Sequence, residues 1–251
     1  MGAVVREAGA GGIGAGRADA GDVTTVPAML AAEGLVLPGP LRAGPAVEHP
    51  ATTVVGPVEA QAARSPEAPA LLLADGGVVT YRELNTAANR LARALARRGA
   101  RPGTVVGLAP ARRSEEMLTA LLAVAKSGAA YLPLDPADPP GRRDRLLAEN
   151  EPVCVLGEAV PGALTGLDTT GELDTDPPRA LTPQHLLSVG YGPGGRPAAV
   201  RLTHGEADRR VRELQAAHPL GPGDRVLQLR LPHWGFLWPL RTGAAVVLTG
   251  E

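Results

Sequence analysis

The chain has 251 residues, with 25 basic and 26 acidic side chains and a formal net charge of −1. This balance provides no basic field for nucleic acid or an anionic membrane, and the single cysteine, Cys154, excludes an internal disulfide and a cysteine-rich zinc site. No apolar run reaches the roughly 18 residues of a membrane-spanning helix, and the first residues lack the pattern of a secretory signal. We therefore expect a cytoplasmic protein without nucleic-acid or membrane partners.

Residues 1–50 are rich in alanine, glycine and proline and show little hydrophobic periodicity. We expect a low-complexity, disordered arm with one short helix near Val26–Glu33. Gly9–Gly14 matches the GxGxxG pattern of dinucleotide-binding loops, but the amphipathic helix that should follow is missing. We interpret this match as accidental.

From residue 51 onward, short apolar runs alternate with amphipathic segments. The expected helices cover residues 57–64, 81–98, 115–127, 142–150 and 204–217. The expected strands cover residues 70–74, 105–108, 129–134, 153–156, 186–189, 200–203, 226–229 and 244–248. Residues 158–180 are acidic and irregular, as in a loop or linker. The alternation predicts an α/β fold, with a mainly parallel sheet flanked by helices.

Several helix boundaries are encoded locally. Thr80 and Thr203 each precede a glutamate by three positions, the pattern of a capping box in which hydroxyl and carboxylate satisfy exposed N–H groups. Ser114 is placed to cap the helix that follows it. Gly99 and Gly128 are placed to end helices, because glycine adopts the left-handed conformation that often follows a last helical turn.

Five segments occur in an order that resembles the amino-acid adenylation domains of nonribosomal peptide synthetases, in the acyl-adenylate-forming superfamily. They are Val58–Ala70, Val79–Asn85, Lys126–Pro136, Gly221–Gln228 and Trp238–Leu240. The resemblance covers roughly residues 57–251 and implies the N-terminal part of an adenylate-forming enzyme core. We therefore divide the chain into an arm, residues 1–50, and a truncated adenylation-like domain, residues 51–251. The first motifs are structural in character, so we expect Lys126 to be a solvated cation at a helix end and not a catalytic group.

The glycine-rich segment Ser188–His204 falls where the resemblance implies a loop that holds the phosphates of ATP, with magnesium. The pattern in the family is a tyrosine, a run of Thr, Ser and Gly, and then Gly-x-Pro-Lys-Gly. Here Ala198 takes the lysine position, Ala199 takes that of the last glycine, and the loop is two residues shorter. Each charge-assisted phosphate contact that is lost costs about 1.5–3 kcal/mol. The candidate nucleotide-binding residues of this degenerate loop are Gly192, Gly194, Gly195, Arg196 and Thr203.

We assign no catalytic residue and no metal ligand. His204 follows Thr203 at a helix start, and we interpret it as a histidine of the capping region. His185, His218 and His233 do not have the spacing of metal ligands.

The resemblance also implies that the ribose-binding aspartate, the catalytic lysine and most of the amino-acid pocket lie downstream of this region. We therefore expect a truncated adenylation-like protein, linked to nonribosomal peptide biosynthesis, without independent catalysis. One alternative is a docking or scaffold partner of a synthetase or carrier protein, using exposed Trp234, Phe236 and Trp238. Another is one subunit of a split amino-acid-activating enzyme that uses ATP. A third is a decayed gene product with no role.

Overall fold

The computed structural model describes residues 3–5, 35–36, 52–109, 114–135, 137–157, 166–178, 180–191, 199–227 and 235–249, the first two ranges as backbone only. The helices are α2 (Val55–Arg64), α3 (Tyr81–Arg97), α4 (Glu115–Ser127), α5 (Pro140–Asn150), α6 (His204–Ala217) and α7 (Leu237–Thr242). The strands are β1 (Ala3–Val5), β2 (Leu35–Val36), β3 (Pro69–Leu72), β4 (Val78–Thr80), β5 (Val105–Leu108), β6 (Ala130–Pro133), β7 (Cys154–Leu156), β8 (Leu186–Tyr191), β9 (Ala199–Thr203), β10 (Arg225–Leu227) and β11 (Ala245–Val247).

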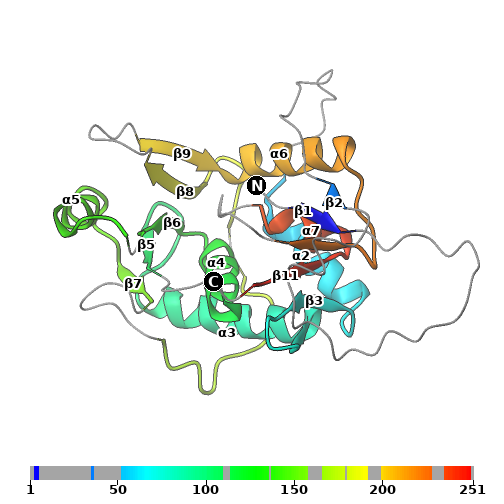
Figure 1. The fold of residues 1–251 in the computed structure, drawn as a ribbon. Coiled ribbons are helices and arrows are strands. Elements are labelled where there is room, and N and C mark those ends of the chain that lie inside the picture. Colours follow the sequence, from blue (N-terminus) through cyan, green and yellow to red (C-terminus); the bar gives the residue numbers. More distant parts are fainter. Residues whose placement is uncertain are drawn as a thin grey trace, which may run out of the picture.

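The strands form two sheets (Figure 1). One has the order β2-β1-β10-β11-β3-β4 and the other the order β7-β5-β6-β8-β9. Pairing is parallel in the centre of each sheet and at the β7 edge of the second, whereas β1, β2 and β4 in the first sheet and β9 in the second pair antiparallel. The predicted α/β class, mainly parallel with flanking helices, is confirmed. The division into two sheets was not predicted, because hydrophobic periodicity marks strands without saying which of them pair.

The local signals at helix ends act as expected. The Thr80 side chain accepts a hydrogen bond from the Glu83 amide, and the Glu83 carboxylate accepts one from the Thr80 amide at 2.8 Å. Ser114 caps α4 by accepting from the Met117 amide. Gly128 ends α4 with a φ of 85°, a conformation that costs little only for glycine.

Two short strands come from the first 50 residues. β1 pairs antiparallel with β10 and with β2, and thereby extends the first sheet. The expected helix at Val26–Glu33 and the Gly9–Gly14 motif lie outside the described residues. The disordered arm therefore stays a prediction.

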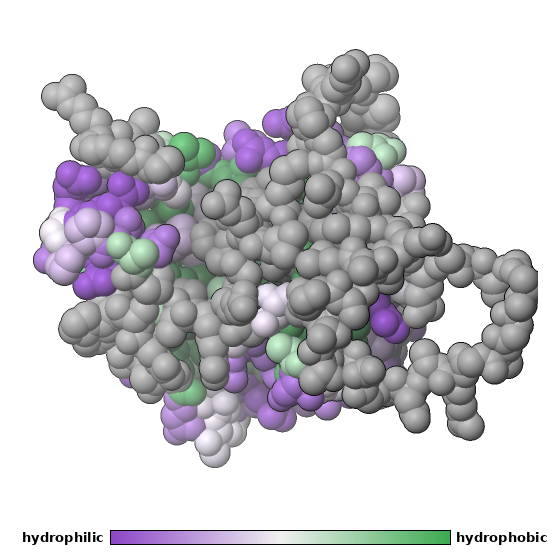
Figure 2. Space-filling model, in the orientation of Figure 1, coloured by the Kyte–Doolittle hydropathy of each residue, from purple (hydrophilic) through white to green (hydrophobic). Residues whose placement is uncertain are grey.

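One continuous apolar core joins the two sheets through α3 and α4. Every residue of α4 from Met117 to Lys126 is buried, as expected for a helix covered on all sides. By contrast, most of α5 is exposed, and hydrophilic side chains gather in Figure 2 where Figure 1 places this helix. Within the part of the chain that the structure describes, no helix combines the length and the hydropathy needed to cross a membrane.

The aromatic residues near α7 correct one expectation. Phe236 and Trp238, expected as exposed docking contacts, are 2% and 3% exposed and belong to the core. The indole of Trp238 donates to Gln215 Oε1 at 2.7 Å. Trp234 lies outside the described residues. The spacing of these residues is equally compatible with a core and with a surface patch, and only the packing of α7 against α2 and α6 decided between them.

Candidate nucleotide-binding site

The β8–β9 hairpin carries the glycine-rich loop at its tip. The two strands pair antiparallel, from Leu186 opposite Thr203 to Tyr191 opposite Ala199. The loop itself, residues 192–198, lies outside the described residues. The assignment of Gly192, Gly194, Gly195 and Arg196 to phosphate binding therefore stays a prediction.

The N-terminal stem of this loop is fixed to α5. Asn150, the last residue of α5, donates from Nδ2 to the Tyr191 hydroxyl at 2.7 Å and to the Leu146 carbonyl at 2.8 Å. The Tyr191 ring packs against a small apolar cluster that includes Leu132 and Leu134. The sequence carried no signal of the contact between Asn150 and Tyr191, because these two residues are 41 positions apart and lie in different elements.

The C-terminal stem ends in a completed helix cap. The hydroxyl of Thr203 accepts from the Glu206 amide at 3.2 Å and donates to Glu206 Oε2 at 3.0 Å. The hydrogen bond from the Thr203 amide, followed by that from its hydroxyl, lowers the pKa of Glu206. The predicted capping box is confirmed. It also means that the Thr203 hydroxyl, a candidate phosphate contact, already serves α6.

The first N–H groups of α6 have protein partners. The amide of His204 donates to the His185 carbonyl at 3.0 Å, and the amide of Gly205 donates to the Pro183 carbonyl at 2.8 Å. The amide of Glu206 donates to Thr203, as described above. Helix N-termini bind phosphate through such amides when these N–H groups have no protein partner. Here an anion would have to displace three existing hydrogen bonds.

His204 is the first residue of α6 and is fully buried. The side chains that cap this helix are those of Thr203 and Glu206, so His204 lies beside the cap without providing it. No group of three or more His, Cys, Asp or Glu side chains within the described ranges could hold a metal ion.

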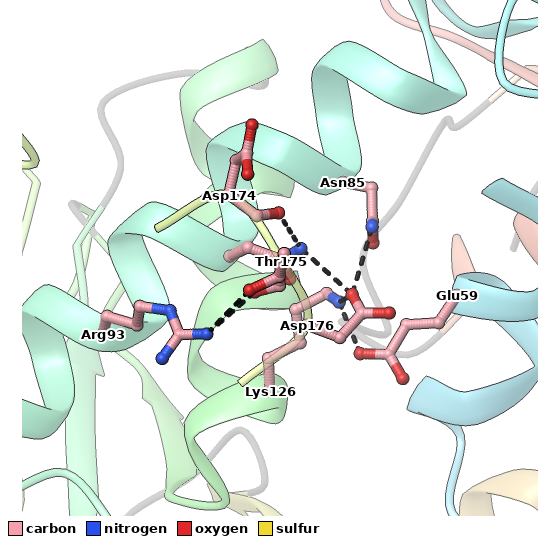
Figure 3. Close-up of polar contacts among 8 residues, drawn as sticks. Glu59, Asn85, Arg93, Lys126, Asp174, Thr175 and Asp176 are labelled. Atoms are coloured by element: carbon pink, nitrogen blue, oxygen red, sulfur yellow. Dashed lines mark hydrogen bonds and ion pairs between the residues drawn. The ribbon is translucent and has the colours of Figure 1, made fainter. Parts of the chain in front are cut away.

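A cluster of charges around one buried lysine lies between α2, α3 and α4 (Figure 3). The Lys126 side chain is 0% exposed, and its Nζ lies 2.5 Å from Glu59 Oε1 and 2.9 Å from Asp176 Oδ1. The expectation that Lys126 is solvated at a helix end is therefore wrong. Lys126 does lie in the last turn of α4, but α2 and the segment that carries Asp176 cover it.

Asp176 is the centre of this cluster. Its Oδ1 also accepts hydrogen bonds from the side-chain amides of Asn85, at 3.1 Å, and Asn89, at 3.0 Å. Partial burial pushes the pKa of Asp176 upward, but the hydrogen bond and positive charge of Lys126, with both asparagines, outweigh it and leave the pKa lowered. Asp176 is therefore held as a carboxylate.

The family described as AMP-binding enzyme matches residues 58–251, and the chain belongs to this family. It is 39% identical over 218 residues to phosphinothricin tripeptide synthetase PhsB of Streptomyces viridochromogenes, an alignment that covers 76% of this chain and 18% of that protein. It is 34% identical over 222 residues to tyrocidine synthase 3 of Brevibacillus parabrevis, covering 80% of this chain and 3% of that protein.

A solved structure is also similar to this chain. The AMPPNP-bound form of the nonribosomal peptide synthetase FmoA3 superimposes with a TM-score of 0.73 at 30% identity, covering 80% of this chain and 23% of that one. The resemblance to adenylation domains of nonribosomal peptide synthetases is thus confirmed. The chain spans less than a quarter of the length of each of these relatives.

Proposed function

We propose that this chain is a degenerate adenylation-type module of nonribosomal peptide biosynthesis that does not form an adenylate by itself. The observation that carries the proposal is the combination of a family core with an altered phosphate loop. The core matches from residue 58 onward, and the relatives named above are peptide synthetases. The loop sequence between Tyr191 and Ala199 contains no serine, threonine or lysine.

The residues present do not fit a magnesium-bound triphosphate. Phosphate loops combine free backbone N–H groups with hydroxyls and a cation. In residues 192–198 the only cation is Arg196, and two of the seven residues are prolines, which have no N–H to donate. The amides at the start of α6 and the Thr203 hydroxyl already have protein partners. We therefore propose that this loop does not hold the triphosphate of ATP.

Amino-acid-dependent exchange of pyrophosphate into ATP tests this proposal. The purified chain with magnesium, ATP and the twenty common amino acids should give no exchange above background. Amide NMR spectra should show no shift at Tyr191 or Ala199 when magnesium ATP is added. Exchange by the wild-type chain would refute the proposal directly.

A gain-of-binding variant makes this negative result informative. Ala198→Lys restores a cation at the lysine position of the motif, and Ala198→Met is a control of similar length without the charge. If the loop is altered but still open, spectra of the lysine variant should shift with magnesium ATP and those of the methionine variant should not. A response of both variants would show that the charge at position 198 is irrelevant.

A docking function is the second candidate, and two exposed apolar side chains favour it. Val78 on the edge strand β4 is 53% exposed, and Val200 on the edge strand β9 is 58% exposed. Edge strands with exposed apolar side chains offer backbone and apolar contacts to a partner. The partner would be a synthetase or carrier-protein component, or the polypeptide that carries the rest of a split amino-acid-activating enzyme. Substitution of either valine by lysine should then abolish co-purification with that component.

A further inference from the structure

The connection between β7 and β8 contains an acidic segment that lies along α3. These two strands are separated in their sheet by β5 and β6, so the chain must cross from one side of the sheet to the other. Residues 166–178 make part of this crossing, and Figure 3 shows Asp174, Thr175 and Asp176 of this part beside the helices. We call residues 166–178 the strap.

Polar contacts hold the strap in place. Its apolar side chains contribute little, since Leu173 is 62% exposed and only Leu167 packs against the core. Every fourth residue of α3 along one face contacts the strap. These residues are Asn85, Asn89, Arg93 and Arg97, and their partners are Asp176, Asp174, Thr175, Glu172 and Asp168. Residues spaced by four lie on one helix face, so α3 presents a polar stripe that complements an acidic segment.

One contact of the strap differs from the others because it reaches a fully buried charge. The ammonium of Lys126 has the carboxylates of Glu59 and Asp176 as partners, and only Asp176 belongs to the strap. When the strap lifts, Lys126 loses Asp176, and the carboxylate of Glu59 on α2 is the partner that stays with it. An ion-pair contact of a fully buried ammonium is costly to break, so the contact of Lys126 with Asp176 opposes release of the strap at this point.

We propose that Asp176 latches the strap to α3 and α4, and that this latch positions the chain where it enters the β8–β9 hairpin. Asp176 is a positioning residue and takes no part in chemistry. The chain continues from it to the turn at Thr182–His185, which bonds to the start of α6, and then directly into β8. Two sets of contacts thus hold the base of the hairpin that carries the glycine-rich loop. One set joins Asp176 to α3 and α4, and the other joins the turn at Thr182–His185 to the start of α6. This inference does not depend on whether the loop binds nucleotide.

Hydrogen–deuterium exchange of the full chain tests the latch with two matched variants. Asp176→Asn removes one of the two carboxylate charges that pair with Lys126 and keeps a side chain of similar size. Asp174→Asn makes the same chemical change two positions away, where the carboxylate is 58% exposed and only approaches Arg90 at 4.0 Å. We expect exchange in the strap to rise by at least about tenfold in Asp176→Asn and to stay within about threefold of wild type in Asp174→Asn.

The location of faster exchange decides between a latch and a simple loss of stability. A latch predicts faster exchange in the strap and in Leu186–Tyr191, with unchanged exchange in β5, which pairs with β6 and β7 and not with Asp176. Equal effects of the two aspartate variants would overturn the proposal, and so would faster exchange confined to the strap. If Asp176→Asn unfolds globally, the same comparison is made with Asn85→Ala, which removes one hydrogen bond to Asp176 and keeps both charges. If strap exchange in Asn85→Ala were as slow as in wild type, the proposal would likewise be overturned.

Discussion

Replacing Lys126 by methionine should destabilise the fold substantially. Lys126 contacts both Glu59 and Asp176, and its side chain is 0% exposed. Methionine fills most of the space of the lysine stem, so the packing loss is small. What remains is two carboxylates that have lost their shared counter-charge. Removing one partner of a buried ion pair costs more than the pair contributed, because the remaining charge is left without compensation.

The expected loss follows from the exposure of the two carboxylates. Breaking a buried pair in this way costs about 3–5 kcal/mol. The Asp176 side chain is 45% exposed and can regain water, whereas that of Glu59 is only 13% exposed. We therefore expect Lys126→Met to lower the free energy of unfolding by about 2–4 kcal/mol.

Urea denaturation followed by circular dichroism measures this change. The midpoint should fall without a change in the slope m, because a similar surface is exposed on unfolding. Arg90→Met is a suitable control, because its partner Asp174 is 4.0 Å away and both side chains are about half exposed. The control should change stability by less than about 0.5 kcal/mol. A loss below about 1 kcal/mol in Lys126→Met, or one equal to the control, would refute the reasoning from burial.

Three further changes test other parts of the fold. Tyr81→Phe should cost about 1–2 kcal/mol in urea denaturation, because the buried hydroxyl donates at 2.9 Å to the carbonyl that precedes β11; an unchanged midpoint would contradict this. Gly128→Ala should cost about 2 kcal/mol or more, since φ is 85° and a Cβ would lie 2.8 Å from a proline ring, whereas Gly99→Ala, at φ 94° in open space, should lose only about 1 kcal/mol. Because the pKa of Asp176 is lowered in the folded state, its contacts contribute to the free energy of unfolding above the usual aspartate pKa of about 3.9. This contribution is lost as the pH falls through the lower pKa of the folded state. Protection of strap amides, measured relative to their intrinsic exchange rate at each pH, should therefore fall on acidification in wild type and fall less in Asp176→Asn; equal losses in the two proteins would contradict this.

Helix boundaries were predictable because their causes are local. The capping boxes at Thr80 and Thr203 need only a hydroxyl and a carboxylate three residues apart, and both are present in the structure. Gly128 ends α4 for a similar reason, since a left-handed residue satisfies its carbonyls within the next turn. Strand positions were also close, with β5 at the expected residues. Such features depend on a few neighbouring residues and can therefore be predicted without knowledge of the tertiary fold.

Burial was harder to predict than secondary structure. Lys126 stands at a helix end, where a cation is usually solvated, yet it lies in the interior because two elements distant in sequence cover it. Phe236 and Trp238 were expected on a surface and are core residues. The hydrogen bond from Asn150 to Tyr191 likewise had no counterpart in the spacing of residues. In each case the partner is tens of positions away, so no local pattern encodes the contact.

The sequence by itself determined the α/β class, the family and the altered composition of the phosphate loop, because each depends on residue types in a short segment or on the order of such segments. Tertiary structure alone decided that the strands divide into two sheets and that the turn at Thr182–His185 accepts hydrogen bonds from the first two amides of α6. It also decided that Asp176 reaches Lys126 from a segment 50 positions away. The partners of a buried charge are the oppositely charged groups that lie beside it in the folded protein, and these can come from any part of the sequence.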